Sequence, residues 1–210
     1  MKDLHVYCAD IGSVEKGRFA WYGGPVNGKK KSGVSMQSLS DEIGLRLRAH
    51  LPVALGIECP LFVLIPEDPI LLTKARPGEG NRAWSAGGGA GALATGLTET
   101  VWILRGIRRI INSNLKVFLN WENFKKKANG LFLWEAFVSG KGKGGSHKGD
   151  AKKAVDKFIV NLPNIDKANA IVVNNLDLDI YSLVGAAIIR SGLSNNIDLL
   201  KEPCIVIKTA

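Results

Sequence analysis

Four acidic residues fall where the surrounding sequence predicts burial. Asp10 ends the apolar stretch HVYCAD, and Glu58 ends the apolar stretch VALGIE. Glu135 interrupts the run LFLWEAFV on the strand face that is otherwise apolar, since alternate residues of a strand share a face. Asp150 begins the amphipathic segment DAKKAVDKFIV in line with its apolar side. An isolated buried carboxylate is costly, so each must be paired, protonated or bound to a metal ion.

A shared metal site is one chemistry that such acids support. Carboxylate oxygens are the ligands that hard divalent cations such as Mg²⁺ or Mn²⁺ prefer, usually with waters completing an octahedron. A pair of these ions can align an in-line attack on a phosphodiester. We therefore predict that Asp10, Glu58, Glu135 and Asp150 face one cleft, although they are far apart in the chain.

Ordinary structural explanations compete with the metal site. Asp is a common N-cap, so Asp150 would cap its helix. Asp10, at the end of the first strand, would bend the chain into the following turn. Glu58 and Glu135 would pair with arginines such as Arg76 or Arg82. At the level of the sequence these alternatives stay open.

The elements that must carry these residues follow from hydrophobic periodicity. The predicted strands are 3–12, 18–24, 52–58, 115–121 and 131–140, with 203–208 as a final strand or extended tail. The predicted helices are 35–51, 92–113, 151–160 and 181–193, with 122–130 as a short basic helix or turn. Strands come first and then alternate with helices, which predicts an α/β fold with one mixed sheet covered by helices. Residues 66–91, rich in Gly and Pro, are predicted to be irregular.

Length and composition favour one soluble globular domain over residues 1–210. The three cysteines form no CxxC pair, which fits a reducing compartment. No signal peptide is visible, and the longest apolar run is too short and too broken to cross a bilayer. These features predict a cytoplasmic location without a membrane partner and leave the oligomeric state open, a homodimer included.

The net charge of +9 suggests a polyanionic partner, most often nucleic acid, although solubility alone explains it equally well. The loop before Asp150 is the most informative basic cluster, because Lys141, Lys143 and Lys148 adjoin the acid in sequence. Lysines on a glycine-rich loop can hold a phosphate backbone. Arg82, inside the irregular segment, would move in to complete the site.

Several of these stretches resemble the ribonuclease H-like superfamily. YCADIGSVEKGRFAWYG is similar to the opening hairpin of that fold, and GIECPL is similar to the strand that carries the second acid. SHKGDAKKAV resembles the His-x-x-Asp-Ala segment of the Holliday-junction resolvase branch. WEAFVSGK and IECPLF resemble uncharacterised predicted nucleases of the same fold. Together the pieces span most of the chain from Asp3 to Val160.

The resemblance implies a mixed five-stranded sheet flanked by helices and metal-dependent cleavage of phosphodiester bonds. By position, Asp10, Glu58 and Asp150 match the metal-binding acids, and His147 matches the resolvase histidine. Glu135 matches an acid of the uncharacterised group, as a fourth ligand or proton acceptor. The resolvases often carry a second acid close to the last one, where this chain has histidine. The insertion near 66–91 has no counterpart in the resolvases, which leaves the substrate open.

The function predicted from the sequence is therefore a nuclease dependent on Mg²⁺ or Mn²⁺, acting on DNA or RNA. Two alternatives stay open because fold alone does not decide function. One is a nucleic-acid-binding protein of the same fold without catalysis. The other is an enzyme that acts on a small phosphorylated metabolite.

Overall fold

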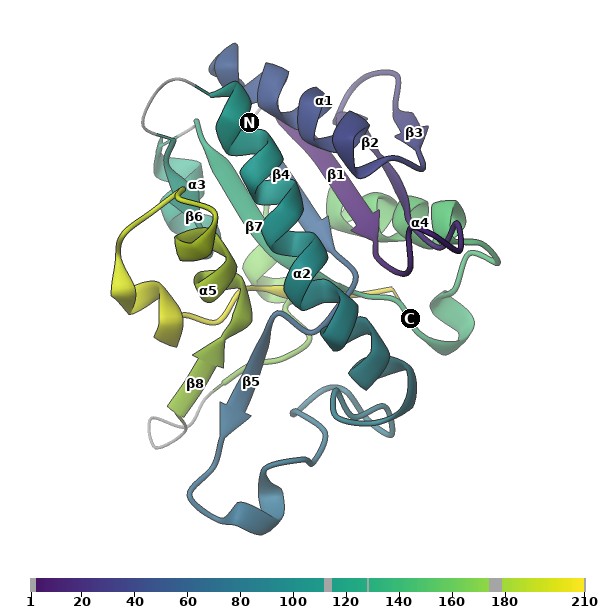
Figure 1. Cartoon of the computed structure of the whole chain (residues 1–210), viewed down its shortest axis with the longest axis vertical. Helices are drawn as coiled ribbons and strands as arrows, with labels where there is room; N and C mark the ends of the chain where they lie inside the picture. The colour runs from purple at the N-terminus through teal and green to yellow at the C-terminus, as the bar shows by residue number, and fades with distance from the viewer. Residues whose placement is uncertain (1–2, 112–114, 128, 174–178, 210) are drawn as a thin grey trace.

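The protein is described by a computed structural model that covers residues 3–111, 115–127, 129–173 and 179–209. Its main element is a mixed sheet with helices on both faces (Figure 1). The strands of this sheet are β1 (His5–Asp10), β2 (Ala20–Pro25), β3 (Lys31–Gly33), β4 (Val53–Ile57), β6 (Val117–Phe118), β7 (Leu131–Phe137) and β9 (Val206–Lys208).

Five strands form the centre of the sheet in the order β3-β2-β1-β4-β7. β1, β2 and β3 are antiparallel neighbours, whereas β4 is parallel to β1 and β7 is parallel to β4. This order and these directions follow the pattern of the ribonuclease H-like fold, and the predicted α/β fold class is confirmed. Apart from β3, which was not predicted, the central strands and most helices lie at the predicted segments.

Two short strands, β6 and β9, extend the sheet beyond its five central strands. β6 pairs with the first residues of β7, and β9 pairs with the last three, so the two follow each other along one edge. The predicted strand 115–121 is thus mostly wrong, because only Val117–Phe118 pairs and α3 (Trp121–Lys127) begins directly afterwards. Of the segment 203–208, predicted as a final strand or extended tail, Val206–Lys208 forms the strand β9.

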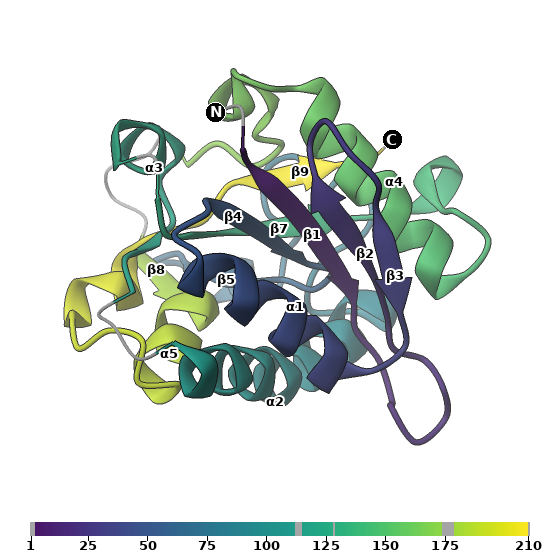
Figure 2. The same ribbon diagram turned by 90° about the horizontal axis from the view of Figure 1, so that it is seen from above.

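The helices divide between the two faces of the sheet (Figure 2). One face carries α1 (Met36–Arg48), α2 (Gly87–Ile110) and α5 (Leu183–Arg190), and the other carries α3 and α4 (His147–Val160). Alternate residues of β1 enter the two cores. Tyr7 and Ala9 lie in one core, and Val6 and Cys8 lie in the other. Burial on both faces explains why this strand is apolar at nearly every position.

The insertion follows a strand that the sequence did not predict, and it ends earlier than the expected irregular segment. β5 (Phe62–Ile65) pairs with β8 (Asp179–Ser182) in a separate two-stranded antiparallel sheet. α2 begins at Gly87, whereas the sequence predicted irregular chain up to residue 91. Glycine permits this start, because a Cβ at Gly89 would lie 2.7 Å from the carbonyl oxygen of Ala83. Of the helices described, none is long and apolar enough for a membrane crossing.

Candidate metal centre

Parallel pairing of two strands places the first two acids side by side. Asp10 is the last residue of β1, and Glu58 directly follows β4. The strands are in register at Ala9 and Ile57, and the Glu58 N–H donates to the Ala9 carbonyl oxygen at 2.8 Å. The carboxyl ends of parallel neighbours meet at one edge of a sheet. Both carboxylates therefore emerge at the same edge.

Asp150 reaches this edge from α4, which packs against β1 and β2. One oxygen from each of Asp10, Glu58 and Asp150 lies within 4.8 Å of the others, and all three side chains are buried or partly buried. The sequence prediction that these three acids converge is thus met by the geometry. The arrangement is an all-oxygen cluster with three formal negative charges, which is the donor set that hard divalent cations select.

A divalent cation also fits the hydrogen bonding of the cluster. Oε2 of Glu58 is buried and has no hydrogen-bond partner within the described parts of the chain. A buried carboxylate oxygen without a partner is costly, and a coordinated cation removes that cost. Asp10 and Asp150 each use one oxygen in hydrogen bonding, to His147 and to the Gly144 N–H respectively.

Without a cation the cluster binds protons instead. Burial, and after it the negative charges of Asp10 and Asp150, raises the pKa of Glu58 to about 9. Burial also raises the pKa of Asp10 to about 6, against the opposing effect of His147. Desolvation and like charge both disfavour ionised carboxylates. A cation bound here must therefore displace a proton, so its affinity rises with pH.

His147 orients the Asp10 carboxylate. It is the first residue of α4, and its Nδ1 lies 2.8 Å from Asp10 Oδ2, while 45% of its side chain is exposed. The ring thus holds the carboxylate from the solvent side of the cluster.

The N-cap of α4 is Ser146, whose hydroxyl accepts the Gly149 N–H at 3.1 Å. The alternative that Asp150 caps this helix is therefore wrong. Asp150 instead accepts a hydrogen bond from the Gly144 N–H in the preceding loop, which ties the lysine-containing segment to the cluster.

Glu135 is not one of the three clustered acids. Its Oε1 lies 2.5 Å from Arg76 Nη2, and its Oε2 accepts from Arg76 Nη1 at 3.0 Å and from the Leu61 N–H at 2.8 Å. Arg76 also bonds Glu79 and the Phe62 carbonyl oxygen. The alternative of arginine pairing is confirmed for Glu135, and with both oxygens engaged it has no evident role as a fourth ligand or proton acceptor.

Sequence reasoning missed Glu99, a further acid near the cluster. Its Oε2 accepts the Gly12 N–H at 3.3 Å, just beyond Asp10, and the residue is 9% exposed. Burial raises its pKa, and the charge of Asp10 adds to this effect. A signal was present: Glu99 shares a four-residue spacing with Ile103 and Ile107, which form the buried face of α2.

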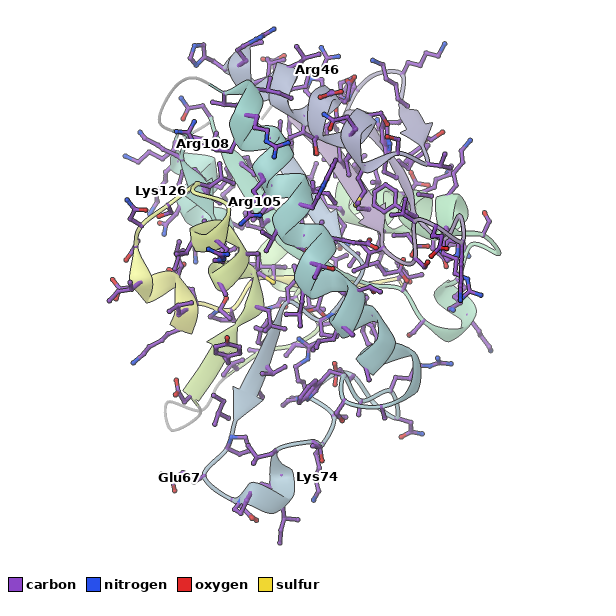
Figure 3. The ribbon with its side chains drawn as sticks, viewed as in Figure 1. Arg46, Glu67, Lys74, Arg105, Arg108 and Lys126 are labelled. Carbon is purple, nitrogen blue, oxygen red and sulfur yellow. The ribbon has the colours of Figure 1, made fainter. Side chains whose placement is uncertain are left out.

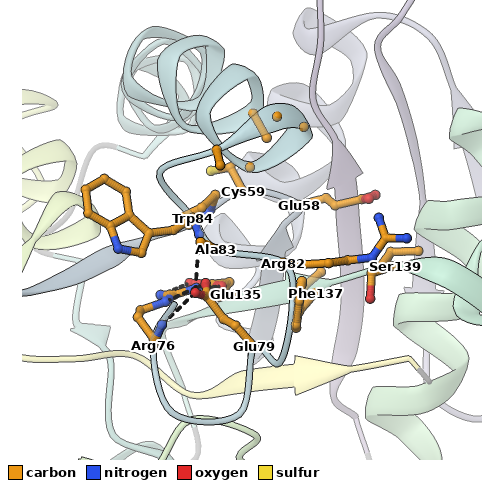
Figure 4. A pocket seen from close by; sticks show the side chains of 18 of the residues that line it. Glu58, Cys59, Arg76, Glu79, Arg82, Ala83, Trp84, Glu135, Phe137 and Ser139 are labelled. Carbon is orange, nitrogen blue, oxygen red and sulfur yellow. Dashed lines mark hydrogen bonds and ion pairs between the residues drawn. The ribbon is translucent and has the colours of Figure 1, made fainter. Parts of the chain in front are cut away.

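A cavity of about 530 Å³ adjoins the cluster (Figure 4). Glu58 and Lys143 line it together with Arg82 and other residues of the insertion. The charge of Lys143 lowers the pKa of both Asp10 and Glu58, which places this lysine within electrostatic reach of the cluster.

Two of the basic residues singled out in the sequence lie near the cluster, and two arginines of α2 lie far from it. Lys141 and Lys148 are exposed and flank the loop that bonds Asp150. Arg105 and Arg108 lie in the C-terminal half of α2, where they donate to the carbonyl oxygens of residues 190 and 192 (Figure 3). These arginines secure α5 and the turn after it and are remote from the cavity at the start of α2.

Comparison of the chain with protein-family models, with curated proteins and with solved structures finds no match. The functional interpretation therefore depends on the geometry of the residues themselves.

Arg76→Met tests the buried ion pair. We expect the free energy of unfolding to fall by about 3–5 kcal/mol, because the variant leaves buried carboxylates without their partner. Adding Glu135→Gln should recover part of the loss. Arg82→Met is the matched control, since this exposed arginine lines the same cavity, and we expect a change within about 0.5 kcal/mol. Urea denaturation measures all four proteins, and a loss below about 1 kcal/mol for Arg76→Met would contradict the assignment.

Glu58→Gln tests the protonation of the cluster in metal-free buffer. The pKa of Glu58 rises from 4.5 in the unfolded chain to about 9 in the folded protein, so the folded state holds the extra proton between these values. The parent therefore loses stability as pH rises through this window, whereas the amide does not titrate. We expect the melting temperature of the variant to gain on that of the parent between pH 5 and pH 9. A difference in melting temperature between variant and parent that stays constant across this pH range would show that Glu58 ionises normally.

Proposed function

We propose that the protein is a divalent-metal-dependent nuclease that hydrolyses phosphodiester bonds in a nucleic acid. The observation that carries this proposal is the convergence of Asp10, Glu58 and Asp150 at the carboxyl edge of β1 and β4. The strand order supports it, because the resemblance to ribonuclease H-like nucleases implies an acidic site at this edge.

The three clustered acids would hold Mg²⁺ or Mn²⁺. When bound, such an ion neutralises phosphate charge and helps to generate the attacking hydroxide. His147 keeps the Asp10 carboxylate oriented, and its exposed ring would face the incoming phosphate or the attacking water. The hydrogen bond from Gly144 to Asp150 holds the loop of Lys141 and Lys143 against the cluster.

The basic side chains would bind the phosphates on either side of the cleaved bond. Lys141, Lys143 and Lys148 lie on the segment next to Asp150, and Arg82 lies on the insertion across the cavity. Contacts of this kind position a nucleic acid without reading its sequence.

Asp150→Asn separates catalysis from folding. The amide oxygen can still accept the Gly144 N–H, but the negative charge that a cation needs is lost. We expect Mn²⁺-dependent cleavage of labelled nucleic acids to fall by about 100-fold or more, with the melting temperature unchanged or higher in metal-free buffer.

Asp156→Asn is the matched control, because this exposed residue of the same helix only pairs with Lys152. An exposed ion pair contributes little, so the control should cleave and melt like the parent. Parent-level cleavage by folded Asp150→Asn would remove Asp150 from the active site. A parent that binds nucleic acid without any metal-dependent cleavage would favour the non-catalytic alternative.

Salt dependence tests the nucleic-acid partner. Lysines that contact phosphates release condensed counterions, so affinity should fall steeply as salt rises. Lys141→Gln and Lys148→Gln should each reduce the slope of log affinity against log salt by about 1. Lys126→Gln, on α3, is the control and should leave the slope unchanged. Affinity that does not vary with salt would instead favour a small phosphorylated metabolite as substrate.

A further inference from the structure

The cavity beside the cluster is built largely by the insertion that precedes α2. Its volume of about 530 Å³ lies within the range of sites that hold a small organic molecule. Residues 81–84 form one wall, the start of α2 forms another, and the end of β7 closes the third side. Because Glu58 belongs to the acidic cluster and also lines the cavity, a group held here would lie next to a phosphate at the candidate metal centre.

The base of the cavity carries charges that are already neutralised. Arg76 lies there with Glu79 and Glu135, and all three are buried and bonded to one another (Figure 4). This ion-pair group leaves no free cation to bind a phosphate at the inner end. The free cations, Arg82 and Lys143, are exposed, and in Figure 4 Arg82 extends toward the side where Glu58 and Ser139 lie.

The rest of the lining suits a flat, uncharged ring with polar edges. Trp84 and Phe137 are the aromatic residues of the lining, and the start of α2 contributes small residues. Asn81 and Ser139 supply an amide and a hydroxyl, which can donate and accept hydrogen bonds. Aromatic surface with a few polar groups, next to cations, is how proteins bind a nucleobase whose phosphates lie outside the pocket.

We infer that this cavity receives one unstacked nucleobase of a single-stranded nucleic acid, adjacent to the phosphate held at the acidic cluster. The inference rests on the proposed nuclease function and specifies its substrate class. A base inside a duplex is stacked and paired, so it enters a side cavity only after unstacking. A single strand presents its bases without that cost. A free mononucleotide carries the same chemistry, and the experiment must separate the two sources.

Two glycines of α2 allow a matched test. An added Cβ at Gly88 or at Gly91 meets no atom within 4 Å, and both glycines are exposed. Gly88 lines the cavity, whereas Gly91 belongs to the next turn and does not. Gly88→Phe should therefore add an aromatic ring at the rim of the cavity without a clash at Cβ, and Gly91→Phe is the control for an added ring outside the lining. Replacing glycine inside a helix also lowers the entropy cost of helix formation, so both variants should fold.

The measurement is fluorescence anisotropy with one labelled sequence, prepared as a single strand and as a blunt duplex, in DNA and in RNA form. Unlabelled mononucleotides serve as competitors. We expect the single strand to bind the parent more tightly than the duplex does. Gly88→Phe should weaken single-strand binding by about fivefold or more, since this is the lower end of what one base–aromatic contact typically contributes. Gly91→Phe should bind like the parent.

Three results would overturn the inference: duplex binding as tight as single-strand binding, an unchanged affinity in Gly88→Phe, or binding confined to mononucleotides. Cleavage measured on the same samples keeps the two proposals apart. Metal-dependent cleavage that is equal in the parent and Gly88→Phe would uphold the nuclease and reject the nucleobase site. A Gly88-dependent affinity for single strands without cleavage would uphold the site and reject the nuclease.

Discussion

The mutual repulsion of three carboxylates within 4.8 Å is the constraint that the surrounding structure must overcome. Burial strengthens this repulsion, because the charges are removed from water. The fold brings the acids together by backbone pairing: β1 and β4 hold Asp10 and Glu58 in parallel register, and α4 packs Asp150 against them. The cost appears in the raised pKa values of Asp10 and Glu58. A site that costs stability when empty is ready to bind a cation, since binding relieves the repulsion.

Glu135 shows how the same fold treats an acid that serves structure. Its two oxygens have three donors, and its partner Arg76 is 3% exposed. Glu58 is partly buried at the same edge of the sheet, yet one of its oxygens has no partner within the described residues. Glu58 follows an apolar strand and Glu135 interrupts one, and both line the same cavity. What separates them is the donor set around each carboxylate, which is the observable difference between an acid satisfied by the protein and one that awaits a ligand.

The parts of the fold that depend on local pattern could be predicted from the sequence. Apolar runs of strand length located β1, β4 and β7, and the acids at the ends of the first two runs, Asp10 and Glu58, indicated a common edge. Partners set by long-range geometry could not be predicted. Arg76 and Glu135 are 59 positions apart, and nothing in the sequence chooses Arg76 over Arg82. β5 pairs with β8 across most of the chain, and the start of α2 at Gly87 depends on close packing against Ala83 rather than on helix propensity. The burial of Glu99 was not predicted, because an acid within a long helix is usually solvent-exposed.

The insertion connects the acidic cluster with the cavity beside it. Arg76 fastens it to β7 through Glu135, and residues that follow within the same segment form the cavity wall next to Glu58. An acidic cluster at the edge of parallel strands supplies chemistry that is common to any phosphodiester, so it discriminates poorly among nucleic acids. Selectivity must come from whatever decides how the strand approaches that edge. In this protein Glu79 pairs with Arg76 and also accepts the Trp84 N–H at 3.2 Å, so the ion pair holds the cavity wall that would border this approach. Under the proposed nuclease function, the buried ion pair would thus contribute to substrate choice through geometry, although Arg76 and Glu135 are not part of the cluster.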